Sequence, residues 1–190
     1  ILNQGYRSCA ITLLHAYRNP LHELELQNWL IKLGFTNAIC SHQVSPLPRI
    51  ISRGQTTLIE ATVSPVLLRY LIKIRSDLGP STRLRVMGSS GNLSTTEELL
   101  AKDTILSGPA GGMVGAVAAA KASGFTKEPL VGLDMGGTST DVFYVPNSQI
   151  GEWERIPETE VAGQKLISRR LRIHTVAAGG GSIICVNKER

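Results

Sequence analysis

The residues best suited to chemistry lie in the stretch LDMGGTSTDVFYV. Asp134 and Asp141 flank a turn that contains Gly136, Gly137 and Thr138, and apolar runs typical of β-strands lie on both sides. Glycines permit positive φ and leave their amides accessible to a phosphate, and the Thr138 hydroxyl adds a donor. The two carboxylates supply oxygen ligands of the kind that Mg²⁺ prefers.

A carboxylate that faces a phosphate without a metal is repelled, because both groups are negatively charged. We therefore interpret the stretch as a strand–turn–strand hairpin that holds a phosphate together with Mg²⁺. Asp134 and Asp141 are the candidate metal ligands, and Gly136, Gly137 and Thr138 are the candidate cofactor-binding residues. The alternative is a glycine-containing hairpin with two solvated acids.

Two further glycine clusters flank this hairpin. SGPAGGMVGAVAAAKASG, which begins at Ser107, is interpreted as a loop that enters a helix, and the first amides of that helix could hold a phosphate. Close packing of a small-residue helix on a sheet explains its glycines equally well. In IHTVAAGGGSI, Gly179, Gly180 and Gly181 could line the same nucleotide cleft or form a structural turn. His174, alone in that run, is more typical of a packed or hydrogen-bonded histidine than of a catalytic base.

The elements before these clusters begin with a predicted βαβ unit. SCAITLLHAY predicts a buried strand, Asn19 and Pro20 begin a helix that Gly34 ends, and TNAICSHQV predicts a second strand. Parallel strands joined by a helix imply an α/β layer architecture.

The middle of the chain predicts one long helix and several short elements. SPLPRIISRGQTT is interpreted as a proline-containing connection, and TLIEATVSPVLLRYLIKIRSDLG as a helix that Pro65 kinks or restarts. RLRVMGSSG predicts a strand that runs into a loop, and Thr95 with Glu98 predicts a capping box before a short helix. Glycine and alanine become dense afterwards, so we place a domain boundary near residue 105, between 1–105 and 106–190.

Composition argues against several other classes of protein. The chain has 190 residues, is 42% hydrophobic and 18% charged, and has no apolar run long enough for a membrane span. Its net charge of +5 is compatible with an anionic partner. The basic residues are dispersed, however, and only 5% of the residues in the chain are aromatic, so we expect no nucleic-acid binding. Cys9, Cys40 and Cys185 lack metal-ligand spacing and are predicted to be buried, reduced thiols of a cytoplasmic protein.

Taken in order, several motifs resemble the hydantoinase A/5-oxoprolinase family. They are DMGGTSTDV, SGPAGG with VGA, RGQTT and IHTVAAGGGSI, and LLHAYRNPLHE is similar to a segment that the family carries upstream. The resemblance covers essentially the whole chain. It implies part of an actin/hexokinase-like ATPase fold, in which a βαβ layer ends the first lobe and linking region (1–105) and a glycine-rich hairpin lobe starts the second, nucleotide-binding lobe (106–190). One phosphate hairpin of that fold is matched by Asp134, Gly136, Gly137, Thr138 and Asp141.

The same resemblance implies ATP and Mg²⁺ as cofactors and the ATP-dependent hydrolysis of a cyclic amide, with 5-oxoproline opened to glutamate. The alternatives are hydantoin or ketone substrates and a non-catalytic nucleotide-binding module. We expect a small-molecule lactam or hydantoin as partner, no membrane, and a homo-oligomer or a complex with a hydantoinase B-like subunit or domain. Because the chain lacks an initiating Met and the other phosphate hairpin of the family, we expect a fragment that is inactive alone, and no catalytic residue is identified.

Overall fold

The computed structural model describes residues 1–125, 127–146, 153–183 and 185. Within these ranges, helices and strands are mixed in the first part of the chain, and five consecutive strands follow the last helix. The helices are α1 (Leu21–Leu33), α2 (Ser41–Val44), α3 (Ile50–Leu78) and α4 (Ser107–Ala122), with the 3₁₀ helices η1 (Leu2–Gln4) and η2 (Ala101–Thr104). The strands are β1 (Ser8–Ile11), β2 (Asn37–Cys40), β3 (Val86–Met87), β4 (Leu93–Ser94), β5 (Leu130–Met135), β6 (Thr140–Val145), β7 (Arg155–Val161), β8 (Gln164–Leu171) and β9 (Ile173–Val176).

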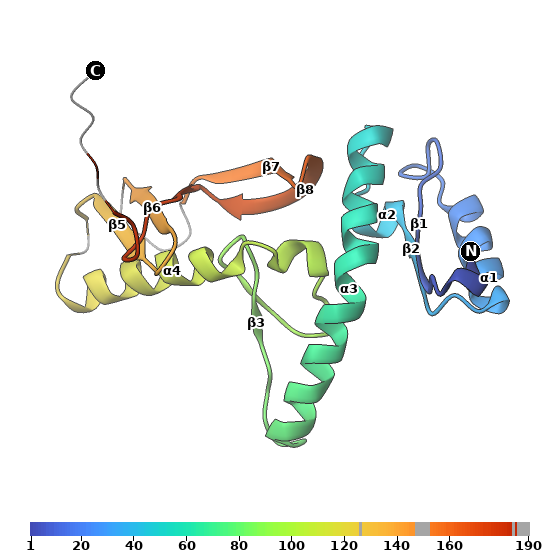
Figure 1. Cartoon of the computed structure of the whole chain (residues 1–190), viewed down its shortest axis with the longest axis horizontal. Coiled ribbons are helices and arrows are strands. Elements are labelled where there is room, and N and C mark those ends of the chain that lie inside the picture. The colour runs from blue at the N-terminus through green and yellow to red at the C-terminus, as the bar shows by residue number, and fades with distance from the viewer. Residues whose placement is uncertain (126, 147–152, 184, 186–190) are drawn as a thin grey trace.

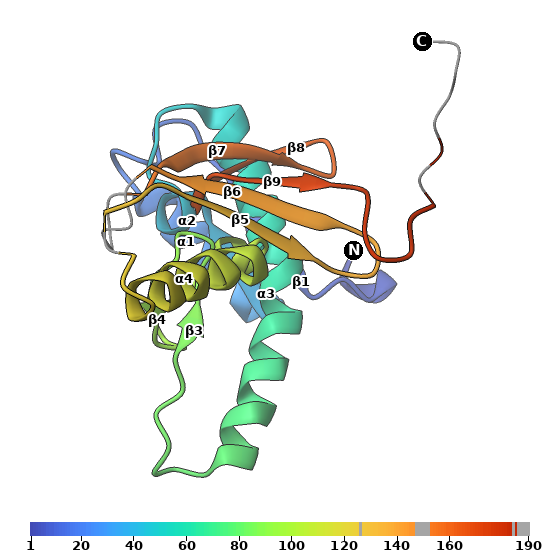
Figure 2. The same ribbon diagram turned by 90° about the vertical axis from the view of Figure 1, so that its left-hand side faces the viewer.

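Figure 1 shows an elongated molecule in which the long helix α3 separates two groups of elements. The β1–α1–β2 unit lies on one side of α3, and α4 with strands β5 and β6 lies toward the opposite end. The β7–β8 hairpin reaches from that end to α3, where the Ile167 amide donates a hydrogen bond to Thr56 Oγ1 at 2.9 Å. Figure 2 shows β5, β6 and β9 side by side above α4.

The predicted βαβ unit is confirmed. Strand β1 pairs with β2 in parallel, and α1 connects them. The Leu21 amide at the start of α1 donates a hydrogen bond to Asn19 Oδ1 at 3.2 Å. Gly34 ends the helix in the left-handed conformation, with φ of 108°. The glycine therefore ends the helix as the sequence predicted, whereas the N-cap position falls on Pro20, one residue after the predicted Asn19.

Both strands of this unit are shorter than predicted. Strand β1 ends at Ile11, and the SHQV half of the second predicted strand forms α2. The reason is a tertiary contact, because the buried carboxylate of Glu23 accepts hydrogen bonds from the amides of Leu13 at 2.9 Å and His42 at 3.1 Å. These bonds direct the backbone of both segments toward α1 and away from the strand ladder.

Helix α3 begins earlier than predicted. The RGQTT segment, which was interpreted as part of a connection, lies inside the helix, and Pro65 neither ends nor restarts it. Arg53 Nε donates a hydrogen bond to Ser41 Oγ at 2.9 Å, and Thr57 Oγ1 donates to the Arg53 carbonyl at 2.7 Å. Such contacts outweigh the weak intrinsic helix preference of glycine and threonine.

The capping box predicted a helix in the wrong place. Thr95 Oγ1 does donate a hydrogen bond to Glu98 Oε2 at 3.1 Å, but the following helical turn is η2. The buried Glu60 of α3 explains this position, because its carboxylate accepts hydrogen bonds from the amides of Ala101 at 3.1 Å and Lys102 at 2.7 Å.

The first glycine cluster lies within α4 and not in a loop before it. Ala110, Met113 and Val117 of α4 are buried against Phe143 of β6 in one hydrophobic core. The packing is tight at Gly132 of β5, where a Cβ would lie 2.0 Å from Phe143 Cζ. Gly132 and Phe143 are partners in the β5–β6 ladder, so the missing side chain at Gly132 leaves room for the Phe143 ring.

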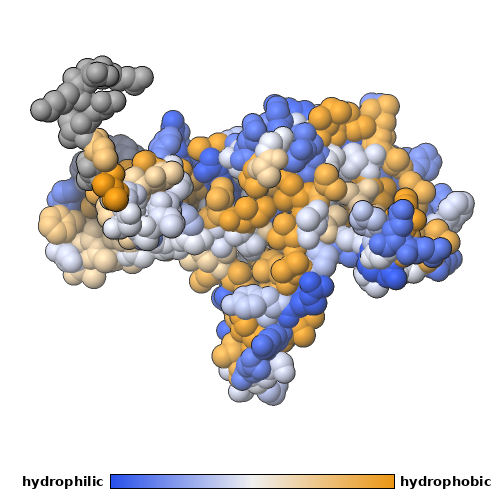
Figure 3. All heavy atoms as spheres, viewed as in Figure 1, coloured by the Kyte–Doolittle hydropathy of each residue, from blue (hydrophilic) through white to orange (hydrophobic). Residues whose placement is uncertain are grey.

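Two surfaces of the molecule carry exposed apolar side chains. On β5, Val131 and Leu133 are exposed on the face of the sheet that does not pack on α4, and on α3 Ile51, Val66 and Ile72 are exposed. Figure 3 shows hydrophobic residues gathered over the middle of the molecule, where α3 lies. Even so, no helix within the described ranges is apolar over the length that a membrane crossing needs.

The cysteines are free, as predicted, but not uniformly buried. Cys40 is buried, Cys9 is half-buried and Cys185 is exposed, so the prediction of three core thiols was wrong for the last of these. Burial raises the pKa of the Cys40 thiol to about 11. The predicted domain boundary near residue 105 falls between η2 and α4. A hydrogen bond joins α3, before this boundary, to β8, after it, and the division into two domains stays a prediction.

Candidate functional site

The predicted hairpin forms between β5 and β6, which pair antiparallel with Met135 opposite Thr140 at the turn. The Gly136 amide donates a hydrogen bond to the Ser139 carbonyl at 2.9 Å and closes the turn. Neither Gly136 nor Gly137 adopts a positive φ. A Cβ would make only an ordinary 3.5 Å contact with the Ser139 carbonyl oxygen at Gly136 and would meet nothing within 4 Å at Gly137, so neither positive φ nor crowding by the described residues explains these two glycines.

Asp134 and Asp141 lie directly opposite each other in this register and share one face of the sheet. Like charges in that position destabilise a sheet. Asp141 Oδ1 accepts a hydrogen bond from Thr175 Oγ1 of β9 at 2.6 Å. A cation between the carboxylates would offset their repulsion, so the chemistry of this donor set fits Mg²⁺.

One glycine of α4 makes room for this acidic pair. A Cβ at Gly112 would lie 3.3 Å from Asp134 Oδ2, which is tighter than an ordinary contact. At Gly108 and Gly115, by contrast, a Cβ would meet nothing within 4 Å. Close packing therefore explains Gly112 but leaves the other two glycines without a packing role among the described residues.

The third glycine cluster packs directly on the turn of the hairpin. The amides of Gly180 and Gly181 donate hydrogen bonds to the carbonyls of Gly136 at 2.9 Å and Gly137 at 3.0 Å. A Cβ at Gly179 would lie 2.6 Å from the Gly136 carbonyl oxygen and 2.8 Å from the Gly137 carbonyl carbon. Only glycine fits at position 179 without displacing backbone.

Free donors remain on the turn and not on the third cluster. The Gly179 amide donates to Ser182 Oγ at 2.9 Å, so all three glycine amides of the cluster are bonded within the protein. The amides of Gly137 and Thr138 have no hydrogen-bond partner among the residues that the structure describes, nor does the Thr138 hydroxyl. The hairpin turn therefore keeps the donors that a phosphate needs, and the third cluster supports it.

His174 is neither packed nor part of this arrangement. It is exposed on β9, opposite Val142 of β6. The expectation of packing was therefore wrong, and the expectation that His174 is not a catalytic base stays a prediction.

Sequence reasoning missed a buried polar cluster beside the βαβ unit. The carboxylate of Glu23 accepts hydrogen bonds from Ser41 Oγ at 2.6 Å and His42 Nδ1 at 2.7 Å, in addition to the amides of Leu13 and His42. Burial alone would raise the pKa of Glu23, but the hydrogen bonds from Ser41, His42 and Leu13 outweigh it and hold the pKa below its ordinary value. Polar residues within apolar segments were the only sequence signal of this cluster.

The same cluster does not suit a metal ion, although Glu23, Cys40 and His42 place ligand atoms within 4.8 Å of one another. Hydrogen-bond donors already surround the Glu23 carboxylate. Cys40 Sγ donates to the Glu23 carbonyl at 3.4 Å, and a thiol that stays protonated is a poor ligand. We assign the cluster a structural role.

This role predicts a large loss of stability in Glu23→Ala. Removing the carboxylate leaves several buried donors without an acceptor, and we expect the free energy of unfolding to fall by about 3–5 kcal/mol. The measurement is chemical denaturation of the two proteins at neutral pH. Glu25→Ala is the matched control, because Glu25 is exposed on the same helix, and it should change stability little.

The stability difference should also depend on pH. Because the pKa of folded Glu23 is lowered from its ordinary value of 4.5, its stabilising contribution is complete above that value. The contribution is lost as the pH falls through the lower pKa of the folded state. Wild type and Glu23→Ala should therefore converge in stability in acid, and a difference that stays constant down to acid pH would argue against the assignment.

Comparison with known proteins identifies the family of this chain. The profile described as hydantoinase/oxoprolinase matches residues 53–190, which is more than half of the chain and includes the hairpin and the third cluster. The chain belongs to the hydantoinase/oxoprolinase family. Within this family, the chain is 37% identical over 186 residues to 5-oxoprolinase 1 of Arabidopsis thaliana, which covers 96% of the chain but 14% of that protein.

Two solved structures share the fold. An ATP-dependent caprolactamase from Pseudomonas jessenii superposes with a TM-score of 0.80 at 27% identity, over 99% of this chain and 27% of the other. A nucleotide-free acetone carboxylase, which carries out ATP-dependent acetone carboxylation, superposes with a TM-score of 0.77 at 25% identity, over 98% and 27%. The predicted fold class, an α/β chain with part of the ATPase fold of hydantoinase-family proteins, is therefore confirmed. The chain spans a small part of the length of each relative.

Proposed function

We propose that this chain is the phosphate-binding part of an ATP- and Mg²⁺-dependent enzyme that hydrolyses a cyclic amide, with 5-oxoproline as substrate and glutamate as product. The observation that carries the proposal is the opposed pair of Asp134 and Asp141 beside the unbonded amides of Gly137 and Thr138. A cation would offset the repulsion between the two carboxylates, and an anion would accept hydrogen bonds from the two amides. Mg²⁺ together with the phosphates of ATP provides both charges. The similarity to a plant 5-oxoprolinase supports the choice of substrate.

Each residue of the site has a proposed task. Asp134 and Asp141 hold Mg²⁺, directly or through its water ligands. Gly137 and Thr138 donate hydrogen bonds to a phosphate, and Gly136 keeps the turn closed. The third cluster stays in the proposed cofactor site as the segment that holds the turn in place: Gly179, Gly180 and Gly181.

The chemistry explains why a lactam hydrolase needs a phosphate site. Resonance makes an unstrained amide carbon a poor electrophile. When the amide oxygen attacks the γ-phosphorus of ATP, ADP leaves and the ring carbon becomes imidate-like. One water then adds to that carbon, the C–N bond breaks toward nitrogen to give the amino group, and a second water releases the phosphate and leaves the carboxylate.

The contribution of the hairpin to this reaction is positional and electrostatic. Asp134 and Asp141 would hold Mg²⁺, which would supply positive charge against the charge that develops on the transferred phosphoryl group, and the turn would fix the orientation of the phosphates. Among the described residues, we assign none to the activation of water.

The partners and location are proposed for the complete protein, because the chain spans 14% of the plant relative. We propose a small-molecule substrate and either a homo-oligomer or a complex with a hydantoinase B-like subunit or domain. We place the protein in the cytoplasm, where free cysteines such as Cys40 stay reduced. Membrane and nucleic-acid partners are not part of the proposal.

The test is product formation by the complete protein. It is incubated with Mg²⁺, ATP and, in separate reactions, 5-oxoproline, hydantoin, caprolactam, or acetone with bicarbonate. We expect phosphate release above background with 5-oxoproline, together with an equal amount of glutamate. Turnover of another substrate alone would replace 5-oxoproline, and ATP binding without turnover of any substrate would favour a non-catalytic nucleotide-binding module.

A further inference from the structure

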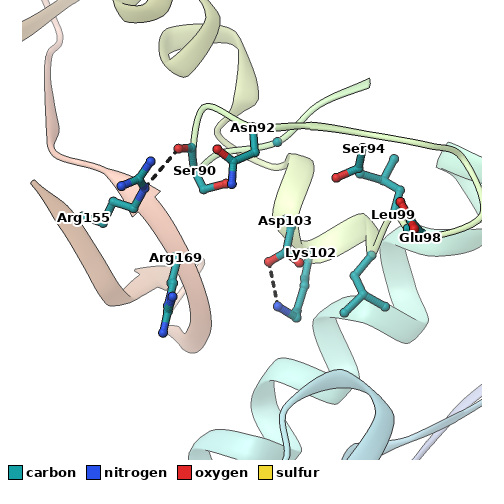
Figure 4. A pocket seen from close by; sticks show the side chains of 11 residues that line it. Ser90, Asn92, Ser94, Glu98, Leu99, Lys102, Asp103, Arg155 and Arg169 are labelled. Atoms are coloured by element: carbon teal, nitrogen blue, oxygen red, sulfur yellow. Dashed lines mark hydrogen bonds and ion pairs between the residues drawn. The ribbon is translucent and has the colours of Figure 1, made fainter. Parts of the chain in front are cut away.

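A cavity lies apart from the β5–β6 hairpin, between the β3–β4 loop, η2 and the β7–β8 hairpin. Its volume is about 550 Å³, within the range of small-molecule sites. Figure 4 shows Arg155 and Arg169 at one side of it with the loop residues Ser90 and Asn92 next to them, and the pair of Lys102 and Asp103 in the middle. The opposite side is formed by Ser94, Glu98 and Leu99. The lining is thus mainly polar and comes from separate segments of the chain.

The lysine and the aspartate of this cavity neutralise each other. Lys102 Nζ donates hydrogen bonds to Asp103 Oδ1 at 2.6 Å and to the Ile167 carbonyl at 3.2 Å. Asp103 Oδ1 also accepts a hydrogen bond from Ser168 Oγ at 2.6 Å. Glu98 also lines the cavity, and its carboxylate accepts a hydrogen bond from Thr95 Oγ1 at 3.1 Å. Because Lys102 and Asp103 neutralise each other, Arg155 and Arg169 outweigh the single charge of Glu98, and the cavity lining keeps a net positive charge.

The two arginines differ in their contacts. Arg155 Nε donates a hydrogen bond to the Ser90 carbonyl at 3.3 Å, which ties the β7–β8 hairpin to the loop. Arg169 lines the cavity and is exposed, and no hydrogen bond or ion pair joins it to the part of the chain that the structure describes. Its guanidinium offers the forked donors that match a carboxylate.

One turn of α4 lies next to both the loop that lines the cavity and the carboxylate of Asp134. Gly88 lines the cavity, and a Cβ at Gly111 would lie 4.0 Å from Cγ of its neighbour Met87. The next residue, Gly112, approaches Asp134 Oδ2. The loop that lines the cavity and the carboxylate assigned to Mg²⁺ therefore contact successive residues of the same helix.

We propose that this cavity binds the carboxylate of the lactam substrate, with Arg169 as its ion-pair partner and Ser90 and Asn92 as hydrogen-bond donors. The inference rests on the proposed function and adds the group of the substrate that is recognised. 5-Oxoproline carries a carboxylate on the ring carbon next to nitrogen, whereas 2-pyrrolidinone is the same ring without it. Arg169 therefore selects carboxylated lactams over neutral ones.

The test compares Arg169→Gln and Arg169→Lys with wild type in the complete protein. Because a hydrogen bond to a charged group contributes about 1.5–3 kcal/mol, the KM for 5-oxoproline should rise about 10- to 100-fold in Arg169→Gln. The KM for ATP and the rate with 2-pyrrolidinone should stay at the wild-type level. Arg169→Lys should restore part of the affinity, because it keeps the charge but loses the fork.

The control is Arg18→Gln, which removes an exposed arginine outside the cavity and should match wild type. If wild type hydrolyses 5-oxoproline and Arg169→Gln keeps the wild-type KM, the inference is overturned and the proposed function stands. If wild type does not hydrolyse 5-oxoproline, the proposed function fails, and equilibrium dialysis with labelled 5-oxoproline still tests the cavity. Binding that weakens in Arg169→Gln supports it, whereas equal binding, or none to wild type, overturns it.

Discussion

Asp134→Asn should lower substrate-dependent ATP hydrolysis by the complete protein about 100-fold or more, because transition-state charge loses its counterion. Asp141→Asn should have a similar effect, since the two carboxylates face each other across the hairpin. The amide side chain keeps the size of the acid but removes the charge that binds Mg²⁺. Phosphate release at increasing Mg²⁺ concentrations is the measurement, and the Mg²⁺ needed for half-maximal rate should rise in both variants.

Asp77→Asn provides the matched control, because Asp77 is an exposed acid near the end of α3. It should keep the wild-type rate and the wild-type Mg²⁺ dependence. If Asp134→Asn and Asp141→Asn also behaved like wild type, neither acid would hold the metal.

Gly179→Ala should have the second largest effect. The added Cβ would lie 2.6 Å from the Gly136 carbonyl oxygen, so either the third cluster or the hairpin turn must move. Overpacking of this kind costs about 1–3 kcal/mol, and here the strain falls on the turn that carries the free amides. We expect a higher KM for ATP together with a lower kcat, measured in the complete protein with 5-oxoproline at saturation.

Gly115→Ala is the control for this substitution. A Cβ at Gly115 in α4 would meet nothing within 4 Å, and alanine stabilises a helix interior by about 0.5–1 kcal/mol relative to glycine. The control should therefore keep the wild-type kinetics and unfold at a slightly higher temperature. An unchanged KM for ATP in Gly179→Ala would show that the turn does not depend on its contact with the third cluster.

Local signals account for the parts of the fold that the sequence predicted correctly. Gly34 ends α1 because glycine adopts the left-handed conformation at low cost, and this preference is visible in the sequence alone. The β5–β6 hairpin was predicted from two apolar runs that flank a turn with two glycines, although neither glycine adopts a positive φ.

The boundaries that were predicted wrongly depend on contacts between distant segments. Helix α3 begins at Ile50 and not after RGQTT, and Arg53 in that segment contacts Ser41 of α2. Strand β2 ends where Glu23 of α1 binds the His42 amide. No property of SRGQTT or SHQV by itself identifies these partners.

The candidate site was predictable in composition but not in detail. The sequence left open whether Gly179, Gly180 and Gly181 line a nucleotide cleft with the hairpin or form a structural turn, and it gave no sign of the hydrogen bonds that occupy their amides. Arg169 gave no signal, because the cavity that it lines is formed by segments far apart in the sequence.

The most direct test of the central claim is calorimetric titration of the complete protein with ATP, with Mg²⁺ and with a chelator. The claim is that Asp134 and Asp141 hold nucleotide phosphates through a divalent cation. Wild type should bind ATP more tightly with Mg²⁺ than with the chelator, and a protein with both Asp134→Asn and Asp141→Asn should lose that difference. If the doubly substituted protein kept the full Mg²⁺-dependent gain in affinity, the account of the hairpin would be contradicted.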